Sequence, residues 1–238
     1  MTYAHDLYAG STVLVTGGTS GLGAATAEAF AALGADVIAA GLNSDALPPA
    51  PGVRGVELDV TDQDAVGNLF ASVQRLDVLV NCAGVIRRDD EFDTAVFEAV
   101  LDVNLTGTMR TSMAAVPLLR ETSGCIINTA SMHSFVSGPR VPAYTASKGG
   151  VAQLTKALAN SFAGDGVRVN AVAPGWISTP LTSEVESSEA GAAIRSRTPM
   201  GRWGRPDEVA DAALFLASPA ARFITGAILA VDGGYLVR

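Results

Sequence analysis

The chain has 238 residues, 48% of them hydrophobic, and a formal net charge of -8 at pH 7. That length and apolar content are enough for one large core, and no linker or second core is visible, so we expect a single domain over residues 1–238. The acidic balance, with Lys and Arg never gathered into a basic stripe, excludes the electrostatic profile of a nucleic-acid-binding protein.

Short apolar runs alternate along the chain with longer segments whose apolar residues recur at helical spacing. The short runs are nearly continuous in Val, Ile, Leu and Ala, as in parallel strands covered by helices on both faces. This alternation predicts an α/β fold with a doubly wound parallel sheet of seven strands. The expected strands are 12–17, 36–41, 53–60, 76–83, 124–129, 167–173 and 227–231. The expected helices are 22–33, 62–73, 94–119, 142–163 and 206–217.

Two connections depart from this alternation. Three prolines in residues 48–51 break any helix between the second and third strands, so we expect an abbreviated loop there. Residues 176–205 follow the sixth strand and are rich in Ser, Thr and Glu. This segment is long for a connection in a compact domain, and we expect it to be a mobile lid over a substrate site.

The first strand runs directly into a glycine-rich turn and then into a helix. The turn reads Thr16-Gly-Gly-Thr-Ser-Gly-Leu-Gly23. Glycines let a backbone approach a pyrophosphate closely, and the start of a helix supplies amide donors and the positive end of its dipole. Strand, glycines and helix in this order favour a Rossmann-like dinucleotide-binding unit over a plain turn.

Further motifs follow at the expected strand ends and on the helices. With the spacing of the glycine-rich turn, they make the chain resemble the short-chain dehydrogenase/reductase family over essentially its whole length. The resemblance implies an NAD(P)-dependent oxidoreductase that moves a hydride between a secondary alcohol and a ketone. The family more often has a second Asn at the position of Cys82. The motifs are Asn81-Cys-Ala-Gly84, Asn104, Ser131, Tyr144-Thr-Ala-Ser-Lys148 and Pro174-Gly175.

By this resemblance, Asn104, Ser131, Tyr144 and Lys148 are expected to be catalytic. Tyr144 and Lys148 lie four residues apart at the start of a predicted helix, so both project from one face. An ammonium beside a phenol favours the phenolate and pulls its pKa of about 10 toward neutrality, where proton transfer is efficient. Ser131 ends the fifth strand, where its hydroxyl can hold the substrate oxygen. The resemblance implies that Asn104 holds a water molecule that links Lys148 to solvent in a proton relay.

The resemblance also implies which residues contact the dinucleotide. Asp59 matches the family position whose carboxylate binds the adenine amino group, whereas the N-cap of the next helix is assigned to Asp62. The second strand ends in Gly41-Leu42, which is neither an acidic ribose ligand nor an Arg for a 2′-phosphate. With no Lys or Arg in residues 17–23 or 42–46, NAD is favoured and NADP is left open. The expected contacts are Thr16, Gly17, Ser20, Gly21, Leu22, Gly23, Asp59, Val60, Asn81, Ala83, Gly84, Tyr144, Lys148, Pro174, Gly175, Ile177 and Thr179.

Three stretches resemble the family members that oxidise sugar acids of the 2-deoxy-gluconate or 2-keto-3-deoxy-gluconate type. A sugar-acid carboxylate calls for an Arg whose planar fork binds both oxygens, and Arg88, Arg140 and Arg202 are candidates. His133 is a candidate contact for a polyol hydroxyl. Alternatively, these arginines belong to solvated loops, and the sugar-acid enzymes carry an apolar residue at the position of His133. The stretches are 83–88, 137–144 and 201–204.

Two other functions stay open at this stage. An NADPH-dependent reductase of 3-oxoacyl thioesters on a carrier protein shares the fold and the catalytic residues, but presents basic residues to its acidic carrier. A non-catalytic dinucleotide sensor or structural subunit would be expected to lose Tyr144 or Lys148. The apolar chain end, residues 223–237, and the family resemblance together favour a homotetramer.

The remaining features concern location, thiols and metals. Met1–Asp6 lack the positive region and apolar stretch of a secretion signal, and charged residues interrupt every long apolar run, so we expect a soluble, cytoplasmic protein without a membrane partner. Cys82 and Cys125 lie in apolar runs and are expected to be free thiols. With two histidines and no carboxylate or Cys cluster at ligand spacing, no metal site is expected.

Overall fold

The computed structural model describes residues 3–238 and contains one seven-stranded sheet. Every neighbouring pair of strands is parallel, and the strand order is β3-β2-β1-β4-β5-β6-β7. The predicted Rossmann-like, doubly wound parallel sheet is therefore confirmed. The strands are β1 (Thr12–Thr16), β2 (Asp36–Gly41), β3 (Val53–Glu57), β4 (Val78–Asn81), β5 (Cys125–Thr129), β6 (Arg168–Pro174) and β7 (Ile228–Val231).

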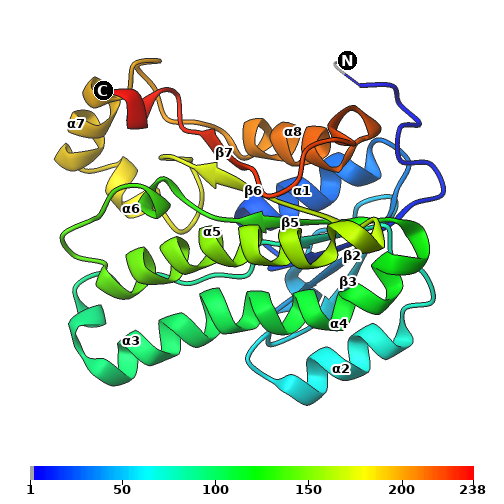
Figure 1. Ribbon diagram of the computed structural model, residues 1–238. Helices are drawn as coiled ribbons and strands as arrows, with labels where there is room; N and C mark the ends of the chain where they lie inside the picture. Colours follow the sequence, from blue (N-terminus) through cyan, green and yellow to red (C-terminus); the bar gives the residue numbers. More distant parts are fainter. Residues whose placement is uncertain (1–2) are drawn as a thin grey trace.

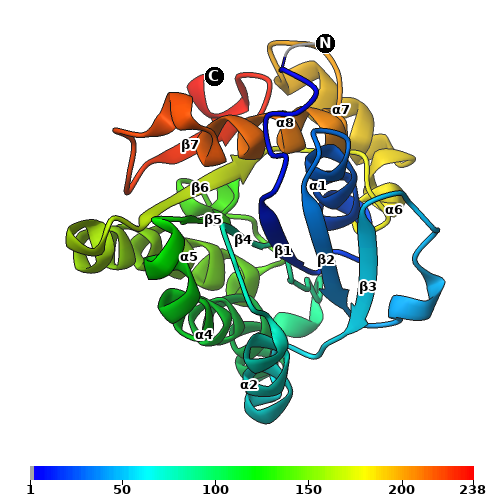
Figure 2. The ribbon, with the colours of Figure 1, turned by 90° about the vertical axis from the view of Figure 1, so that its right-hand side faces the viewer.

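Helices cover both faces of the sheet (Figure 1, Figure 2). On one face lie α1 (Gly21–Ala31) and α8 (Pro206–Ala217), which pack against each other. On the other face lie α2 (Gln63–Ser72), α4 (Gly107–Thr122) and α5 (Pro142–Phe162). A shorter helix, α3 (Thr94–Leu101), packs beside α5. The layers place a hydrophobic core on each side of the strands.

Strand β1 shows why the strands are apolar along their whole length. Leu14 packs into the core beneath α2, α4 and α5, whereas Val13 and Val15 pack into the core beneath α1 and α8. All three side chains are fully buried. A parallel strand covered on both faces has no solvated face, so its side chains are apolar along most of its length.

The predicted helix over 94–119 is interrupted, and that prediction is wrong in this detail. Between α3 and α4 the chain forms a π-helical turn, η3 (Asp102–Thr106), centred on the fully buried Asn104. π-Helical turns are rare and commonly occur at functional sites. Apolar spacing continues through the turn, so periodicity alone does not show it.

The two irregular connections have different structures. Between β2 and β3 only a 3-10 turn, η1 (Ser44–Ala46), forms before the prolines, which confirms the abbreviated loop. After β6, residues 176–205 contain two short helices, α6 (Ser183–Glu186) and α7 (Glu189–Arg197). The sequence did not predict these helices because their exposed, polar surfaces give little apolar periodicity.

Several smaller expectations can be compared with the structure. Cys82 and Cys125 are free thiols, as predicted. None of the described helices combines the length and apolar character needed to cross a membrane. Within residues 3–238, no group of three or more His, Cys, Asp or Glu side chains could hold a metal ion. The stretch predicted to lack a secretion signal begins with Met1 and Thr2. These two residues lie outside the described part of the chain.

Candidate active site

The polar motifs of the sequence lie together at one edge of the sheet. The strand order reverses between β1 and β4, which is where doubly wound folds bind ligands beyond the carboxyl ends of the strands. The glycine-rich turn follows β1, Ala83 and Gly84 follow β4, Ser131 follows β5, and Gly175 follows β6. The topology therefore brings motifs that are far apart in the sequence to a single site.

Two positions in the turn after β1 require glycine. Gly17 has a φ of +64°, and a Cβ there would lie 2.7 Å from the backbone nitrogen of Ala83. A Cβ on Gly23 would overlap the carbonyl oxygen of Gly17. The turn leads directly into α1, whose first amides and helix dipole suit an anionic pyrophosphate. This close-packed turn fits the predicted dinucleotide.

A cleft of about 890 Å³ lies beside the glycine-rich turn. Three carboxylates, from Asp59, Asp90 and Asp102, and one guanidinium, from Arg87, line it. The ionisable side chains around the cleft thus carry a net negative charge. Among the predicted cofactor residues, those that line the cleft are Gly17, Ser20, Asp59, Val60, Ala83 and Gly84.

Two predicted cofactor residues, Thr16 and Asn81, lie beneath the cleft. Their side chains are buried, at 1% and 3% exposure, and neither residue lines the cleft. Asn81 Nδ2 donates to Asn128 Oδ1 at 2.9 Å, and Asn81 Oδ1 accepts from Thr111 Oγ1 at 2.8 Å. Thr16 Oγ1 accepts from the amide of Ala83. These bonds fix the ends of β1 and β4.

The remaining predicted cofactor residues come from α1 and from the chain after β6. Gly21 and Leu22 are the first residues of α1. A Cβ on Gly21 would lie 3.9 Å from the Cβ of Thr179, so the two segments are neighbours. The chain after β6 also contributes Pro174, Gly175 and Ile177.

Three of the four predicted catalytic side chains come together beyond β5. Lys148 Nζ donates to the carbonyl of Thr129 at 2.6 Å and lies 5.6 Å from the centroid of the Tyr144 ring. The Ser131 and Tyr144 side chains line the same small cavity, and the Ser131 hydroxyl acts to lower the pKa of the Tyr144 phenol. A hydroxyl, a phenol and an ammonium thus lie at one point, where a substrate oxygen could meet the first two.

The fourth side chain, Asn104, is held by backbone and hydroxyl partners. Its Oδ1 accepts from the amide of Val85 at 2.8 Å, and its Nδ2 donates to the carbonyl of Val85 at 2.9 Å and to Ser147 Oγ at 3.1 Å. Ser147 Oγ in turn donates to the carbonyl of Tyr144 at 2.7 Å. Asn104 therefore ties the cleft-lining chain at Val85 to the first turns of α5.

The pKa of the Tyr144 phenol differs from the expectation based on Lys148. Burial raises this pKa above its usual value of 10.0, although the nearby Ser131 hydroxyl and the charge of Arg88 lower it; the charge of Glu91 raises it further. Burial also lowers the pKa of Lys148 from 10.5 to about 8. Removal from water disfavours the charged form of both groups. For both groups, burial therefore has a larger effect on the pKa than the neighbouring charges have.

A smaller cavity of about 260 Å³ opens beside Ser131 and Tyr144. The candidate substrate residues His133, Arg88 and Arg140 all line it. The wall contributed by the predicted lid consists of Trp176, Leu181, Thr182, Val185, Ala190 and Ile194.

The two candidate arginines have different surroundings. Arg88 is partly buried, and its Nη1 donates to the carbonyl of Leu181 at 3.3 Å. Arg140 is exposed and forms an ion pair with Asp89 at 3.2 Å. The guanidinium of Arg140 is therefore already compensated. No carboxylate within residues 3–238 forms an ion pair with Arg88.

His133 lies against the phenol. Its ring is in edge contact with that of Tyr144, with 5.8 Å between the ring centroids. Burial lowers the pKa of His133, so the neutral ring is favoured near pH 7. Its buried Nδ1 has no hydrogen-bond partner in the described part of the chain.

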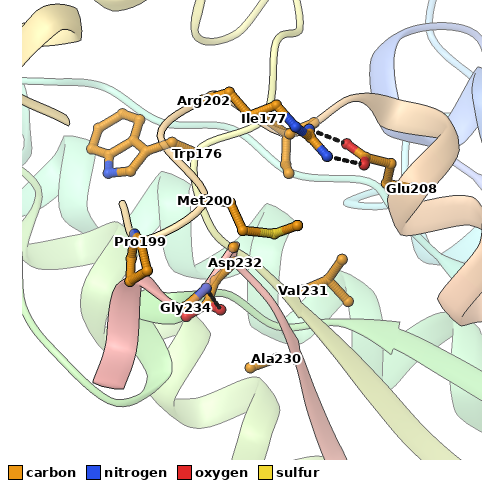
Figure 3. A pocket seen from close by; sticks show the side chains of 12 residues that line it. Trp176, Ile177, Pro199, Met200, Arg202, Glu208, Ala230, Val231, Asp232 and Gly234 are labelled. Atoms are coloured by element: carbon orange, nitrogen blue, oxygen red, sulfur yellow. Dashed lines mark hydrogen bonds and ion pairs between the residues drawn. The ribbon is translucent and has the colours of Figure 1, made fainter. Parts of the chain in front are cut away.

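A third hollow, of about 520 Å³, is lined by the two ends of the lid segment and by β7 (Figure 3). Arg202, the third candidate arginine, lines it and donates to both carboxylate oxygens of Glu208, at 2.8 and 2.6 Å. Asp232 accepts from the amides of Gly234 and Leu236. With its charged groups paired internally and the catalytic side chains outside its walls, this hollow does not resemble the reaction site.

Sequence patterns did not indicate two further residues near the site. Glu91 is 1% exposed and accepts from the backbone amide of Tyr144. Glu57 accepts from the amides of Asn43 and Ser44, just after β2. Glu91 follows two aspartates and looks like part of a solvated acidic turn, so its residue type did not indicate that its side chain is buried. The position of Glu57 at the end of a strand was the one available hint.

Comparison with known proteins gives matches over nearly the whole chain. The family model described as enoyl-(acyl carrier protein) reductase matches residues 17–236. A crystal structure of a candidate 2-deoxy-D-gluconate 3-dehydrogenase from Agrobacterium tumefaciens with bound NADP has a TM-score of 0.90 and 41% identity, and the match covers 98% of this chain and 99% of that one.

Three curated relatives show the range of activities among similar chains. The 2-dehydro-3-deoxy-D-gluconate 5-dehydrogenase of Bacillus subtilis is 41% identical over 254 residues, covering 100% of both chains. The galactitol 2-dehydrogenase (L-tagatose-forming) of Cereibacter sphaeroides is 44% identical over 243 residues, covering 96% of both. The 3-oxoacyl-(acyl-carrier-protein) reductase of Thermotoga maritima is 39% identical over 246 residues, covering 96% of this chain and 98% of that one.

Gly17→Ala is expected to abolish detectable nucleotide binding, because its Cβ would meet the backbone of Ala83 at a φ that L side chains rarely adopt. Gly67→Ala, in an α2 position with open space around the added methyl, is the matched control. That control is expected to bind normally and to gain about 0.5 to 1 kcal/mol in unfolding free energy. Titration calorimetry with NADH measures nucleotide binding by both variants, and thermal unfolding measures their stability. Normal binding by the Gly17 variant would contradict the assignment of the turn.

Proposed function

The chain belongs to the short-chain dehydrogenase/reductase family and is an NAD(P)-dependent dehydrogenase acting on CH–OH groups, and we propose that it oxidises a secondary hydroxyl of a sugar acid or related polyol with NAD. The observation that carries the substrate proposal is Arg88, which lines the small cavity beside Ser131 and Tyr144. A guanidinium without a carboxylate partner suits the carboxylate of a sugar acid. Relatives named for a gluconate derivative and for galactitol support this substrate class.

We assign the chemical roles as follows. When bound, the oxidised nicotinamide would supply the acceptor for the hydride that leaves the carbinol carbon. Tyr144, as phenolate, takes the hydroxyl proton, and Ser131 holds the substrate oxygen by a hydrogen bond; the C–H and O–H bonds are replaced by a C=O bond. The charge of Lys148 favours the phenolate against the effect of burial, and Lys148 would hold the nicotinamide ribose. We propose that Asn104 supports a proton relay that begins at Lys148.

The choice of NAD over NADP rests on charge at the adenosine end of the cleft. Glu57 holds the loop after β2 through the amides of Asn43 and Ser44, at 3.1 and 2.8 Å. These hydrogen bonds lower the pKa of the Glu57 carboxyl, which is therefore ionised at neutral pH. A negative carboxylate beside this loop, with Asp59 in the nearby wall, disfavours a 2′-phosphate.

We assign residues 176–205 the role of a substrate lid within a single domain. The segment supplies one wall of the small cavity, and its contact with Arg88 crosses from the lid to the chain after β4. Closing such a segment over the cavity would exclude water from the proton transfer. The lid and Arg88 would then form the substrate pocket together.

Tyr144→Phe is expected to reduce kcat by at least about 1000-fold, because the phenol is the proposed proton carrier. The measurement follows the absorbance of reduced nicotinamide with NAD or NADP and a panel of gluconate, 2-deoxy-gluconate, 2-keto-3-deoxy-gluconate and galactitol, and with NADPH and a 3-oxoacyl thioester. Activity with NAD and an acid, lost in the variant, is the expected result. Activity confined to NADPH and 3-oxoacyl thioesters would instead support a carrier-protein reductase, and an active Phe variant would refute the role of Tyr144.

Arg88→Gln is expected to raise KM for a sugar acid by about 10- to 100-fold, because a charged hydrogen bond to the carboxylate is lost. KM for galactitol, which has no carboxylate, should change far less. Arg140→Gln is the matched control, since Arg140 is exposed and already paired with Asp89. Equal effects of the Arg88 variant on the acid and on galactitol would argue against carboxylate recognition.

We also propose a homotetramer. Large apolar side chains are exposed on different parts of the chain: Met109 and Met113 on α4, Phe223 before β7 and Val237 after it. A tetramer needs more than one apolar contact surface on each protomer. Sedimentation equilibrium is expected to give four times the chain mass of 24.3 kDa, whereas a stable monomer would refute the proposal.

A further inference from the structure

Glu91 is a buried carboxylate in the chain between β4 and α3. It is 1% exposed and lies in a 3-10 turn, η2 (Asp90–Phe92). Its Oε2 accepts from the amide of Tyr144 at 2.8 Å, and its Oε1 accepts from the amide of Arg87 at 2.8 Å. No Lys, Arg or His within residues 3–238 forms an ion pair with it. Removing a charge from water is costly, so a buried carboxylate held by backbone amides alone calls for an explanation.

The two amides belong to segments that must be aligned. Tyr144 is the third residue of α5, so Glu91 accepts one of the amides that a helix start leaves without an internal partner. The amide of Arg87 belongs to the residue before Arg88. A second contact joins the same segments, because the amide of Asp89 donates to the carbonyl of Arg140 at 3.0 Å. Glu91 thus links the phenol-bearing helix to the arginine-bearing chain.

We propose that Glu91 is a positioning residue that fixes Tyr144 and Arg88 relative to each other through its two backbone hydrogen bonds. The proposal rests on the proposed roles of Tyr144 and Arg88. A ligand held between a phenol and a guanidinium is aligned for reaction only if the distance between them is constant. The lid is included in this arrangement, because Arg88 also donates to the carbonyl of Leu181.

The charge of Glu91 adds a measurable consequence. Around the Tyr144 phenol, Arg88 and Glu91 come from the chain after β4, Ser131 and His133 from the chain after β5, and Lys148 from α5. Glu91 raises the pKa of the phenol, whereas Arg88 lowers it. Neutralising Glu91 should therefore lower the pKa of Tyr144, and neutralising Arg88 should raise it. A general loosening of the site would not produce shifts of opposite sign.

The experiment is an alkaline titration of tyrosinate absorbance on NAD-loaded protein, which needs no knowledge of the substrate. The Tyr144 signal is the difference between each protein and the same protein carrying Tyr144→Phe. Glu91→Gln is expected to move the midpoint to lower pH and Arg88→Gln to higher pH. Glu98→Gln, the same change at an exposed carboxylate on α3, is expected to leave the midpoint unchanged. A Glu91→Gln midpoint at or above that of the unmodified protein would overturn the electrostatic part.

Glu91→Asp tests the positioning part, and it keeps the test valid if Glu91→Gln fails to fold. It retains the charge but is too short to reach both amides, so kcat is expected to fall by about 10- to 100-fold with little change in the midpoint or in KM for NAD. An unchanged kcat would overturn the positioning role. An active Tyr144→Phe variant would refute the proposed function instead, so the two failures are distinguishable.

Discussion

The site depends on how closely the ends of β1 and β4 approach each other. Gly17 lies against the backbone of Ala83 so tightly that a single added methyl carbon would come within 2.7 Å of it. This contact can exist only because the sheet order reverses here, leaving β1 and β4 as neighbours whose following segments turn to opposite sides. The crevice between those segments becomes the cleft.

A buried polar network supports that approach from below. Asn81, at the end of β4, is bonded to Asn128 on β5 and to Thr111 on α4, and Asn128 continues to Thr155 on α5 at 2.9 Å. Leaving any of these buried groups unpaired would cost about 1 to 3 kcal/mol, so the network strongly favours one relative placement of its elements. The same α5 carries Tyr144 and Lys148. The network therefore couples the large cleft to the helix that carries Tyr144 and Lys148 through the interior of the protein.

Sequence patterns predicted the parts of this arrangement that repeat or that need a special residue type. Continuous apolar runs indicate strands buried on both faces, and Gly17 and Gly23 stand where no side chain fits. Features that depend on a single long-range contact were not predictable. The π-helical turn at Asn104 keeps the apolar spacing of an ordinary helix, and Glu91 resembles its solvated neighbours Asp89 and Asp90. The direction of the Tyr144 pKa also depends on burial, which the i, i+4 spacing to Lys148 does not specify.

The chain after β4 lines both the large cleft and the small cavity. Val85 and Arg87 line the large cleft, whereas Ile86 and Arg88 line the small cavity. Extended backbone directs successive side chains to opposite sides, so this one segment is a wall of both spaces. A substitution at Ile86 or Arg88 can therefore change the small cavity without altering the side chains that line the large cleft. Under the roles proposed for these two spaces, substrate choice is separable from cofactor binding, which fits relatives named for an aldonate derivative, a polyol and an acyl thioester on one fold.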